Sequence, residues 1–227
     1  MNWNEIKLSS DNRYFTYQGE PLFEKQFLQA LKFHAPGLAP VCDETGWYHI
    51  DVLGKPLYPE RYPRAFGFYC NRAAVVSASG WQHITDAGIP AYQVYLQWTG
   101  NYQENICAVK SSTGEYFHID LQGNPLYAER YTYAGDFKDG IACVSNKAGR
   151  FSHIDTSGNL LHGQWFKMLG VYHKGFATAM DEKGWFHIDW NGNPLYPERY
   201  IYLEPFYNGV ALALRNDGKK IHVEDHQ

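Results

Sequence analysis

Residues 184–196 read Gly-Trp-Phe-His-Ile-Asp-Trp-Asn-Gly-Asn-Pro-Leu-Tyr, and residues 46–58 read Gly-Trp-Tyr-His-Ile-Asp-Val-Leu-Gly-Lys-Pro-Leu-Tyr. The His-Ile-Asp triplet that they share recurs along the chain, with His-Ile-Thr and His-Val-Glu as relatives and a degenerate copy at residues 14–16. Successive copies are 34 or 35 residues apart. A constant interval of this size indicates that the chain is built from copies of one supersecondary unit.

Each repeat predicts three short strands. The first consists of small residues, as in 141–144, the second contains the triplet, as in 47–51, and the third is the Pro-Leu-Tyr that follows a tight Asp-x-x-Gly turn. The position before the first strand is always glycine or asparagine, the residues that most readily adopt a left-handed backbone; it is occupied by Gly37, Asn71, Asn105, Gly140, Gly175 and Gly209. The pattern predicts an all-β chain of three-stranded meanders.

We expect six such units in a single domain over residues 1–227. They are centred on His49, His83, His118, His153, His187 and His222. The N-terminal segment 1–36 supplies the second and third strands without the first, and the C-terminal end supplies the first and second without the third. Complementary ends of this kind favour a six-bladed β-propeller closed by both termini. An open β-solenoid or superhelix is the alternative.

The composition excludes several classes of partner. The chain has 20 Lys and Arg against 24 Asp and Glu, a formal net charge of −4, which gives no electrostatic reason to expect nucleic acid or an anionic membrane. The N-terminal residues have neither the basic nor the apolar region of a secretory leader, and no apolar run approaches the roughly 20 residues of a membrane helix. The cysteines form no Cys-x-x-Cys pair, so we expect reduced, largely buried thiols and a cytoplasmic protein.

Six histidines in register raise the question of a metal site. A metal needs three or four ligands that converge on one point, whereas a repeat distributes its histidines around a ring or along a ladder. We therefore expect each imidazole to form a hydrogen bond with neighbouring backbone or with an aromatic hydroxyl, and we expect neither metal nor cofactor. If these histidines lie close together, their protonation is mutually unfavourable, which predicts instability below about pH 6.

A second periodicity points to candidate binding residues. The segment Leu-Tyr-x-Glu-Arg-Tyr recurs every 69 residues, and an arginine next to a tyrosine can anchor an anion or a peptide. The alternative is a structural role, in which each arginine stacks or forms a salt bridge between neighbouring units. Trp190 lies in an Asp-x-x-Gly turn, where an exposed ring could contact a sugar or a peptide. The candidate binding residues are Arg61, Arg130, Arg199, Tyr62, Tyr131, Tyr200 and Trp190.

The triplet strand resembles that of the bacterial WG-repeat family, whose units run Gly-Lys-Trp-Gly-Tyr-Ile-Asp-x-x-Gly and then Phe-x-x-Gly-x-Ala-x-Val. Trp47, Trp81 and Trp185 stand where the family has its tryptophan, and Ile-Asp-x-x-Gly and Gly-x-Ala-x-Val agree over about residues 12 to 224. The chain departs from the family in the residue after the tryptophan and in the histidine that replaces the family's tyrosine. The resemblance implies an interaction or scaffolding array, which in some bacterial proteins precedes a methyltransferase domain.

These observations favour a non-catalytic module that recognises a protein or peptide, as an accessory domain of an enzyme such as a methyltransferase. No Gly-x-Ser-x-Gly, Walker loop or His-Glu-x-x-His motif is present. Two alternatives remain open at this point. One is a carbohydrate-binding module that uses exposed aromatic rings, and the other is an enzyme with a His/Asp site at the centre of a ring.

Overall fold

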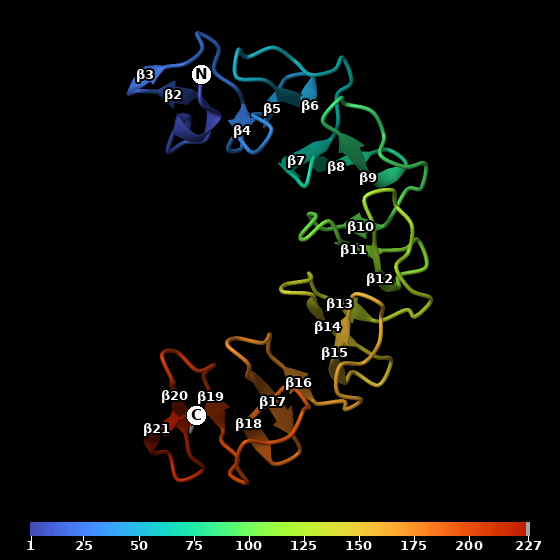
Figure 1. The fold of residues 1–227 in the computed structure, drawn as a ribbon. Coiled ribbons are helices and arrows are strands. Elements are labelled where there is room, and N and C mark those ends of the chain that lie inside the picture. Colours follow the sequence, from blue (N-terminus) through green and yellow to red (C-terminus); the bar gives the residue numbers. More distant parts are fainter. Residues whose placement is uncertain (226–227) are drawn as a thin grey trace. The chain divides into compact units, whose positions relative to one another are not determined.

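The computed structural model describes residues 1–225, and this part of the chain is all-β (Figure 1). A short 3-10 helix at Trp3–Glu5 precedes a series of seven three-stranded antiparallel sheets within the described residues. The sheets are β1 (Lys7–Leu8), β2 (Phe15–Tyr17) and β3 (Glu20–Pro21); β4 (Gln29–Ala30), β5 (Ala39–Asp43) and β6 (Gly46–Ile50); β7 (Arg64–Tyr69), β8 (Arg72–Ser77) and β9 (Gly80–Thr85); β10 (Trp98–Thr99), β11 (Cys107–Lys110) and β12 (Tyr116–Ile119); β13 (Tyr133–Ala134), β14 (Ile141–Ser145) and β15 (Phe151–Asp155); β16 (Met168–Leu169), β17 (Ala177–Asp181) and β18 (Gly184–Ile188); and β19 (Tyr202–Leu203), β20 (Val210–Leu214) and β21 (Lys220–Glu224). The all-β meander predicted from the repeat is confirmed.

The third strand of the unit differs from the prediction. The Pro-Leu-Tyr segment after β6 is not a strand; it forms only an isolated bridge between Pro56 and Ile50, and Tyr62, which follows it, forms a second bridge with Trp47. Proline donates no backbone hydrogen bond, so it cannot continue a ladder in both directions. In the six later sheets the third strand is instead a short segment that precedes the small-residue strand, such as β4, which pairs with β5 over two residues. In the first sheet the predicted strand is present, because β3 contains Pro21 and pairs with β2.

The number of units also differs from the prediction. Residues 1–225 contain seven sheets, because the N-terminal segment forms a sheet of its own in which β1 pairs with β2. The chain divides into two compact units, residues 1–114 with 118–125 and residues 115–117 with 126 onward. Closure into a ring and a single domain over 1–227 stay predictions, and residues 226–227 lie outside the described part of the chain.

The predicted left-handed positions are confirmed. All six have positive φ, between 57° and 98°: Gly37, Asn71, Asn105, Gly140, Gly175 and Gly209. In five of these turns the preceding residue is left-handed as well, as in Asn208 with φ 49° before Gly209 with φ 82°. Two consecutive left-handed residues are typical of the tight type I′ turn, whose twist matches the flanking strands. This geometry brings Tyr207 opposite Val210 at the entry to β20.

Neighbouring sheets contact each other through the Asp-x-x-Gly turns. A Cβ on Gly88 would lie 2.5 Å from the ring of Tyr58, and a Cβ on Gly158 would lie 2.6 Å from the ring of Tyr127. Only glycine allows the ring of one Pro-Leu-Tyr segment to lie this close to the turn of the next unit. The core behind this contact contains the isoleucine of each triplet, which is fully or almost fully buried: Ile50, Ile84, Ile119, Ile154 and Ile188.

Candidate functional site

The triplet histidines of the inner units hold the Pro-Leu-Tyr segment against the sheet. The Nδ1 of His49 lies 2.6 Å from the Tyr58 hydroxyl, and its Nε2 lies 2.8 Å from the carbonyl oxygen of Phe66. His83 and His187 make the same two contacts, with Tyr92 and Gly100 and with Tyr196 and Glu204. The predicted hydrogen bonding to backbone and to an aromatic hydroxyl is confirmed for these three histidines.

The same contacts fix the protonation of the rings. A carbonyl oxygen only accepts, so Nε2 carries the proton and Nδ1 accepts from the tyrosine hydroxyl. Burial disfavours the charged imidazole and lowers the pKa of His49, His83 and His187 to about 4. The rings are neutral at pH 7, and both nitrogens are used by the protein itself. Among residues 1–225, no group of three or more His, Cys, Asp or Glu could hold a metal ion.

In the unit of His153, a second histidine replaces the tyrosine. His162 Nε2 lies 3.3 Å from His153 Nδ1, and His153 Nε2 donates to the carbonyl oxygen of Gly170 at 2.8 Å. His162 Nδ1 in turn accepts from the backbone N–H of Gln164 at 3.3 Å. This chain of contacts makes His162 the donor to His153. Burial lowers the pKa of both, that of His153 to about 4.

The three predicted arginines occupy equivalent positions within their own units. The Nη1 atom of Arg130 donates to three successive carbonyl oxygens, those of Tyr127, Ala128 and Glu129, at 3.0, 3.0 and 2.9 Å. The guanidinium also stacks over the ring of Phe117, 4.2 Å from its centroid. Arg61 stacks over Tyr48 and Arg199 over Phe186 with the same carbonyl contacts. Each arginine therefore closes the turn that precedes its tyrosine.

The structural role that the sequence predicts for these arginines, stacking or a salt bridge between neighbouring units, is wrong in one respect. Each arginine contacts the triplet strand of its own unit. Arg199 adds an ion pair of 2.8 Å to Asp181, which also lies in that unit and whose pKa its contacts hold below the ordinary value. The reason is local: the aromatic residue before each triplet histidine lies beside the turn that the arginine closes.

The three predicted tyrosines pair with the triplet strand through their backbone. Tyr200 N–H donates to the Trp185 carbonyl at 2.9 Å, and Trp185 N–H donates to the Tyr200 carbonyl at 2.8 Å. Tyr62 pairs with Trp47 and Tyr131 with Tyr116 in the same way. Tyr131 and Tyr200 are buried, and Tyr62 is half-buried. The ring of each lies edge-on to the tyrosine four residues earlier.

Trp190 forms an exposed aromatic surface. Its side chain is 47% exposed, and its ring stacks on Tyr172 with centroids 4.2 Å apart and an interplanar angle of 19°. The Tyr172 hydroxyl donates to the Asp189 carbonyl at 2.8 Å, which fixes the lower ring. A cleft of about 280 Å³ adjoins the pair and is lined also by Lys138 and Val171. The expected exposure of Trp190 is confirmed.

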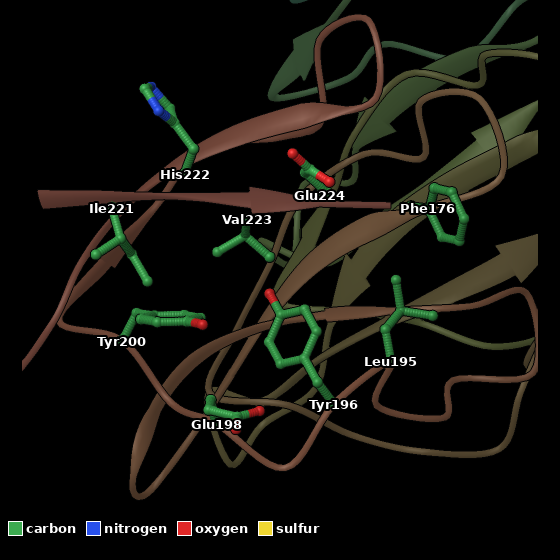
Figure 2. Close-up of a pocket in the computed structure, with 9 residues that line it drawn as sticks. All are labelled: Phe176, Leu195, Tyr196, Glu198, Tyr200, Ile221, His222, Val223 and Glu224. Carbon is green, nitrogen blue, oxygen red and sulfur yellow. The ribbon is translucent and has the colours of Figure 1, made fainter. Parts of the chain in front are cut away.

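A larger groove lies between the third Glu-Arg-Tyr segment and β21. Its volume is about 510 Å³, and its lining includes Tyr196, Tyr200, Ile221, Val223 and Leu195. Figure 2 shows Ile221 and Val223 on one face of β21, directed toward the rings of Tyr200 and Tyr196, with His222 on the opposite face. Of the predicted binding residues, only Tyr200 lines this groove, and Arg199 lies at the neighbouring cleft.

The sequence does not mark the apolar residues of β21 as a site. No motif singles them out, because Ile221 and Val223 follow the ordinary alternation of a half-buried strand. The four cysteines are also less buried than expected. Cys107 is buried, but Cys70 is exposed, and no disulfide is found within residues 1–225. No helix in that part of the chain has the length and apolar character needed to cross a membrane.

The chain is thus an all-β repeat protein, and three of its units contain the internal His–Tyr contact and three the Arg–carbonyl contacts described above. The family model of the WG containing repeat matches residues 118–149, which confirms the resemblance in this segment. No curated protein matches the chain. Similar solved structures include BamB from Moraxella catarrhalis (14% identity, 98% of this chain and 80% of that chain covered, TM-score 0.46), Hsv2p from Kluyveromyces lactis (13%, 87% and 74%, 0.45) and the WD40 beta propeller domain of Doa1 (10%, 98% and 88%, 0.39).

Proposed function

We propose that this chain is a non-catalytic binding module that recognises an extended segment of a protein or peptide. The observation that carries the proposal is the groove beside β21, where apolar side chains line a channel next to the last strand of a sheet. An apolar groove of this kind supplies pockets for the side chains of an extended segment.

The internal contacts support binding at this groove over binding at the predicted arginines. The Nη1 atoms of Arg61 and Arg130 donate to carbonyl oxygens of their own turns, so we assign these residues to the stability of the unit. The buried rings of His49, His83 and His187 are neutral and hydrogen-bonded at both nitrogens, which leaves them without a free proton acceptor for catalysis. Binding is therefore the function that the geometry of the described residues supports best.

We further propose, from the resemblance to WG-repeat proteins, that the module serves as a cytoplasmic accessory domain of an enzyme such as a methyltransferase. Co-purification of a tagged enzyme domain from the same genome with the chain tests this assignment. Loss of the complex in a folded groove variant supports the assignment. Failure of every such domain to form a complex with the chain contradicts it.

The groove is tested by selection from a random peptide display library against the full chain. Leu195→Glu places a charge in the groove at a residue that is 37% exposed, so the fold should tolerate it. Leu53→Glu is the matched control, an exposed leucine in the turn after β6. We expect peptides that bind the wild type and Leu53→Glu but not Leu195→Glu. Selection of no peptide, or equal binding to all three proteins, contradicts the proposal.

Trp190 supports a second candidate function, carbohydrate binding. An exposed indole held flat on a second ring is the kind of platform on which sugar rings stack, and the cleft beside it is open to a ligand. Binding of the chain to a glycan array that is lost in Trp190→Ala and kept in Leu195→Glu would favour this candidate. The reverse dependence would favour the peptide.

A further inference from the structure

The turn that contains Trp190 has an equivalent 69 residues earlier, which contains Leu121. In both copies a tyrosine hydroxyl donates at 2.8 Å to the carbonyl of the aspartate that begins the turn, from Tyr102 in the earlier copy and from Tyr172 in the later one. In the earlier copy the carbonyl of Leu121 also accepts a hydrogen bond from Arg72 Nε at 3.2 Å. An arginine side chain therefore lies beside the earlier turn.

The later copy lacks this arginine. Residue 141 stands 69 positions after Arg72, and it is an isoleucine, whose side chain has no hydrogen-bond donor. The cleft of about 280 Å³ lies at this place, with Ile141 and Trp190 in its lining. No hydrogen bond reaches the Trp190 carbonyl from any residue in 1–225. The cleft thus offers an open backbone acceptor where the earlier copy has the contact of Arg72.

Trp190 is held in a fixed orientation beside this cleft. Its ring stacks on Tyr172 with centroids 4.2 Å apart, and its Nε1 lies 3.4 Å from the place that a Cβ on Gly175 would take. The indole N–H has no hydrogen-bond partner within the described part of the chain. An aromatic ring at this position departs from the four preceding turns, which have Val52, Asp86, Leu121 and Thr156.

Two lysines lie at the cleft, Lys138 in the turn before β14 and Lys174 in the turn before β17. Both are exposed, and neither ammonium group has a hydrogen bond or an ion pair with any residue in 1–225. The remaining charged side chain of the lining, Asp139, already interacts with another residue of the chain. The charge that the cleft offers to a ligand is therefore positive.

A second cleft of about 520 Å³ continues this surface. It shares Lys138 and Val171 with the first cleft, and its lining includes Tyr207, which is 75% exposed. Glu204 also lies there, and its carboxylate accepts a hydrogen bond from the Tyr202 hydroxyl at 3.3 Å. The surface beside Trp190 thus extends to a second exposed aromatic ring.

These features fit a sugar ring that carries a carboxylate. An exposed indole offers a flat apolar face to the C–H face of a sugar, and the Trp190 carbonyl accepts a hydrogen bond from a sugar hydroxyl. The ammonium groups of Lys138 and Lys174 form charge-assisted hydrogen bonds with a carboxylate. The same two lysines repel a cationic side chain, so a basic peptide is a poor ligand for this cleft.

We propose that the Trp190 cleft binds an acidic saccharide. One sugar ring stacks on Trp190 and donates a hydroxyl to its carbonyl, the carboxylate pairs with Lys138 and Lys174, and the next sugar lies toward Tyr207. This assignment rests on the second candidate function, carbohydrate binding, and adds to it the class of sugar and the residues that select it.

The test begins with a glycan array that presents saccharides of uronic or sialic acids beside neutral saccharides of the same linkage. The acidic oligosaccharide with the strongest signal and its neutral counterpart are then titrated into the full chain by isothermal titration calorimetry. We expect the acidic sugar to bind at least about tenfold more tightly, and this preference to shrink as salt is added, because salt screens the paired charges. No preference for any acidic saccharide overturns the proposal.

A pair of lysine substitutions tests the charge selection. Lys138→Ala with Lys174→Ala should weaken binding of the acidic sugar at least about tenfold and leave binding of the neutral sugar within about twofold. Lys147→Ala is the matched control, an exposed lysine in the turn between β14 and β15. If Lys147→Ala weakens acidic binding as much as the pair does, the attraction is not specific to the cleft and the site is wrong.

Ile141→Arg tests the location. Ile141 and Arg72 are both half-buried, so the sheet accepts an arginine at this position. In this variant the guanidinium takes the Trp190 carbonyl and fills the cleft, and we expect the acidic sugar to bind at least about tenfold more weakly. Unchanged binding in the folded variant overturns the location. A circular dichroism spectrum checks the fold, and the lysine pair alone decides if Ile141→Arg does not fold.

The outcomes separate this assignment from the broader functions. If neutral glycans bind in a way that depends on Trp190 and acidic ones bind no better, carbohydrate binding stands and the acidic class is wrong. If no glycan binds, carbohydrate binding and the acidic class are both wrong, whereas recognition of a peptide at the groove beside β21 is unaffected.

Discussion

The buried triplet histidines link the stability of the protein to pH. The pKa of His49, His83, His153 and His187 falls from 6.5 to about 4 in the folded chain, with burial as the main cause. The unfolded chain therefore binds protons at a higher pH than the folded chain. Stability is fully present above about pH 6.5 and is lost as the pH falls toward 4. The instability expected from mutual repulsion thus has another cause, the burial of each ring.

We predict that the urea midpoint of unfolding falls steeply between pH 6.5 and pH 4. Each of these histidines contributes up to about 1.4 kcal/mol per pH unit in this window. In His187→Gln, where a non-titrating amide replaces the ring, the fall should be shallower than in the wild type. Identical pH profiles for the two proteins would show that His187 does not titrate in this way.

The arginine of each Glu-Arg-Tyr segment is predicted to stabilise the fold. Arg130→Ala should lower the free energy of unfolding by about 1–3 kcal/mol, because three carbonyl oxygens lose a charged donor. Arg130→Lys should recover little, since an ammonium cannot stack on Phe117 and reach all three oxygens. Urea denaturation measures both, with Glu129→Gln as the control on an exposed neighbour. Unchanged stability in Arg130→Ala would return this residue to the candidate binding site.

At the scale of the element, the turn glycines set the spacing of neighbouring sheets. Gly88 and Gly149 both have positive φ, 78° and 70°, but only Gly88 lies against a ring, that of Tyr58. Gly88→Ala should therefore destabilise the protein by at least about 2 kcal/mol, through strain and overlap together. Gly149→Ala should cost about 1 kcal/mol, because nothing lies within 4 Å of its Cβ. Thermal unfolding compares the stability of the two variants. Equal losses of stability would exclude a contribution from the contact between residue 88 and the Tyr58 ring.

The strands that could be predicted are those with a repeated pattern of residues. The triplet strand and the small-residue strand are long enough for their alternation to show, and the left-handed turns are visible as Gly or Asn at one position. Two-residue strands such as β4 have no periodicity to detect, and Lys7–Leu8 of β1 lies outside the repeat pattern. Pro56 is in register with Ile50, but its missing N–H limits the pairing to a bridge.

The candidate site was harder to predict than the fold, because its side chains act through contacts between segments. Arg130 stands out in the sequence by the repeated Glu-Arg-Tyr segment, and Trp190 by its place in an Asp-x-x-Gly turn. In the structure, however, Arg130 lies over a turn of its own unit and Trp190 is exposed. Three carbonyl oxygens that converge on one Nη1 atom are a property of the folded turn and leave no mark in residue types. The groove is formed by the rings of Tyr196 and Tyr200 together with β21, which lie far apart in the sequence, so no local pattern of residues predicts it.

At the scale of the whole molecule, the segment that follows a triplet strand covers it in successive units. Pro56 lies opposite Ile50 in this way, and Pro194 lies opposite Ile188. The groove beside β21 is not part of these repeated contacts, and it is the surface of the described residues to which we assign recognition of a protein or peptide.

The most direct test of this account is hydrogen–deuterium exchange of the full chain with and without a saturating peptide selected from the display library. The account predicts slower exchange at the backbone amides of residues 195–200 and 221–224, which line the groove, with little change in β6. Unchanged exchange at these residues, or protection confined to the surface around Trp190, would contradict it.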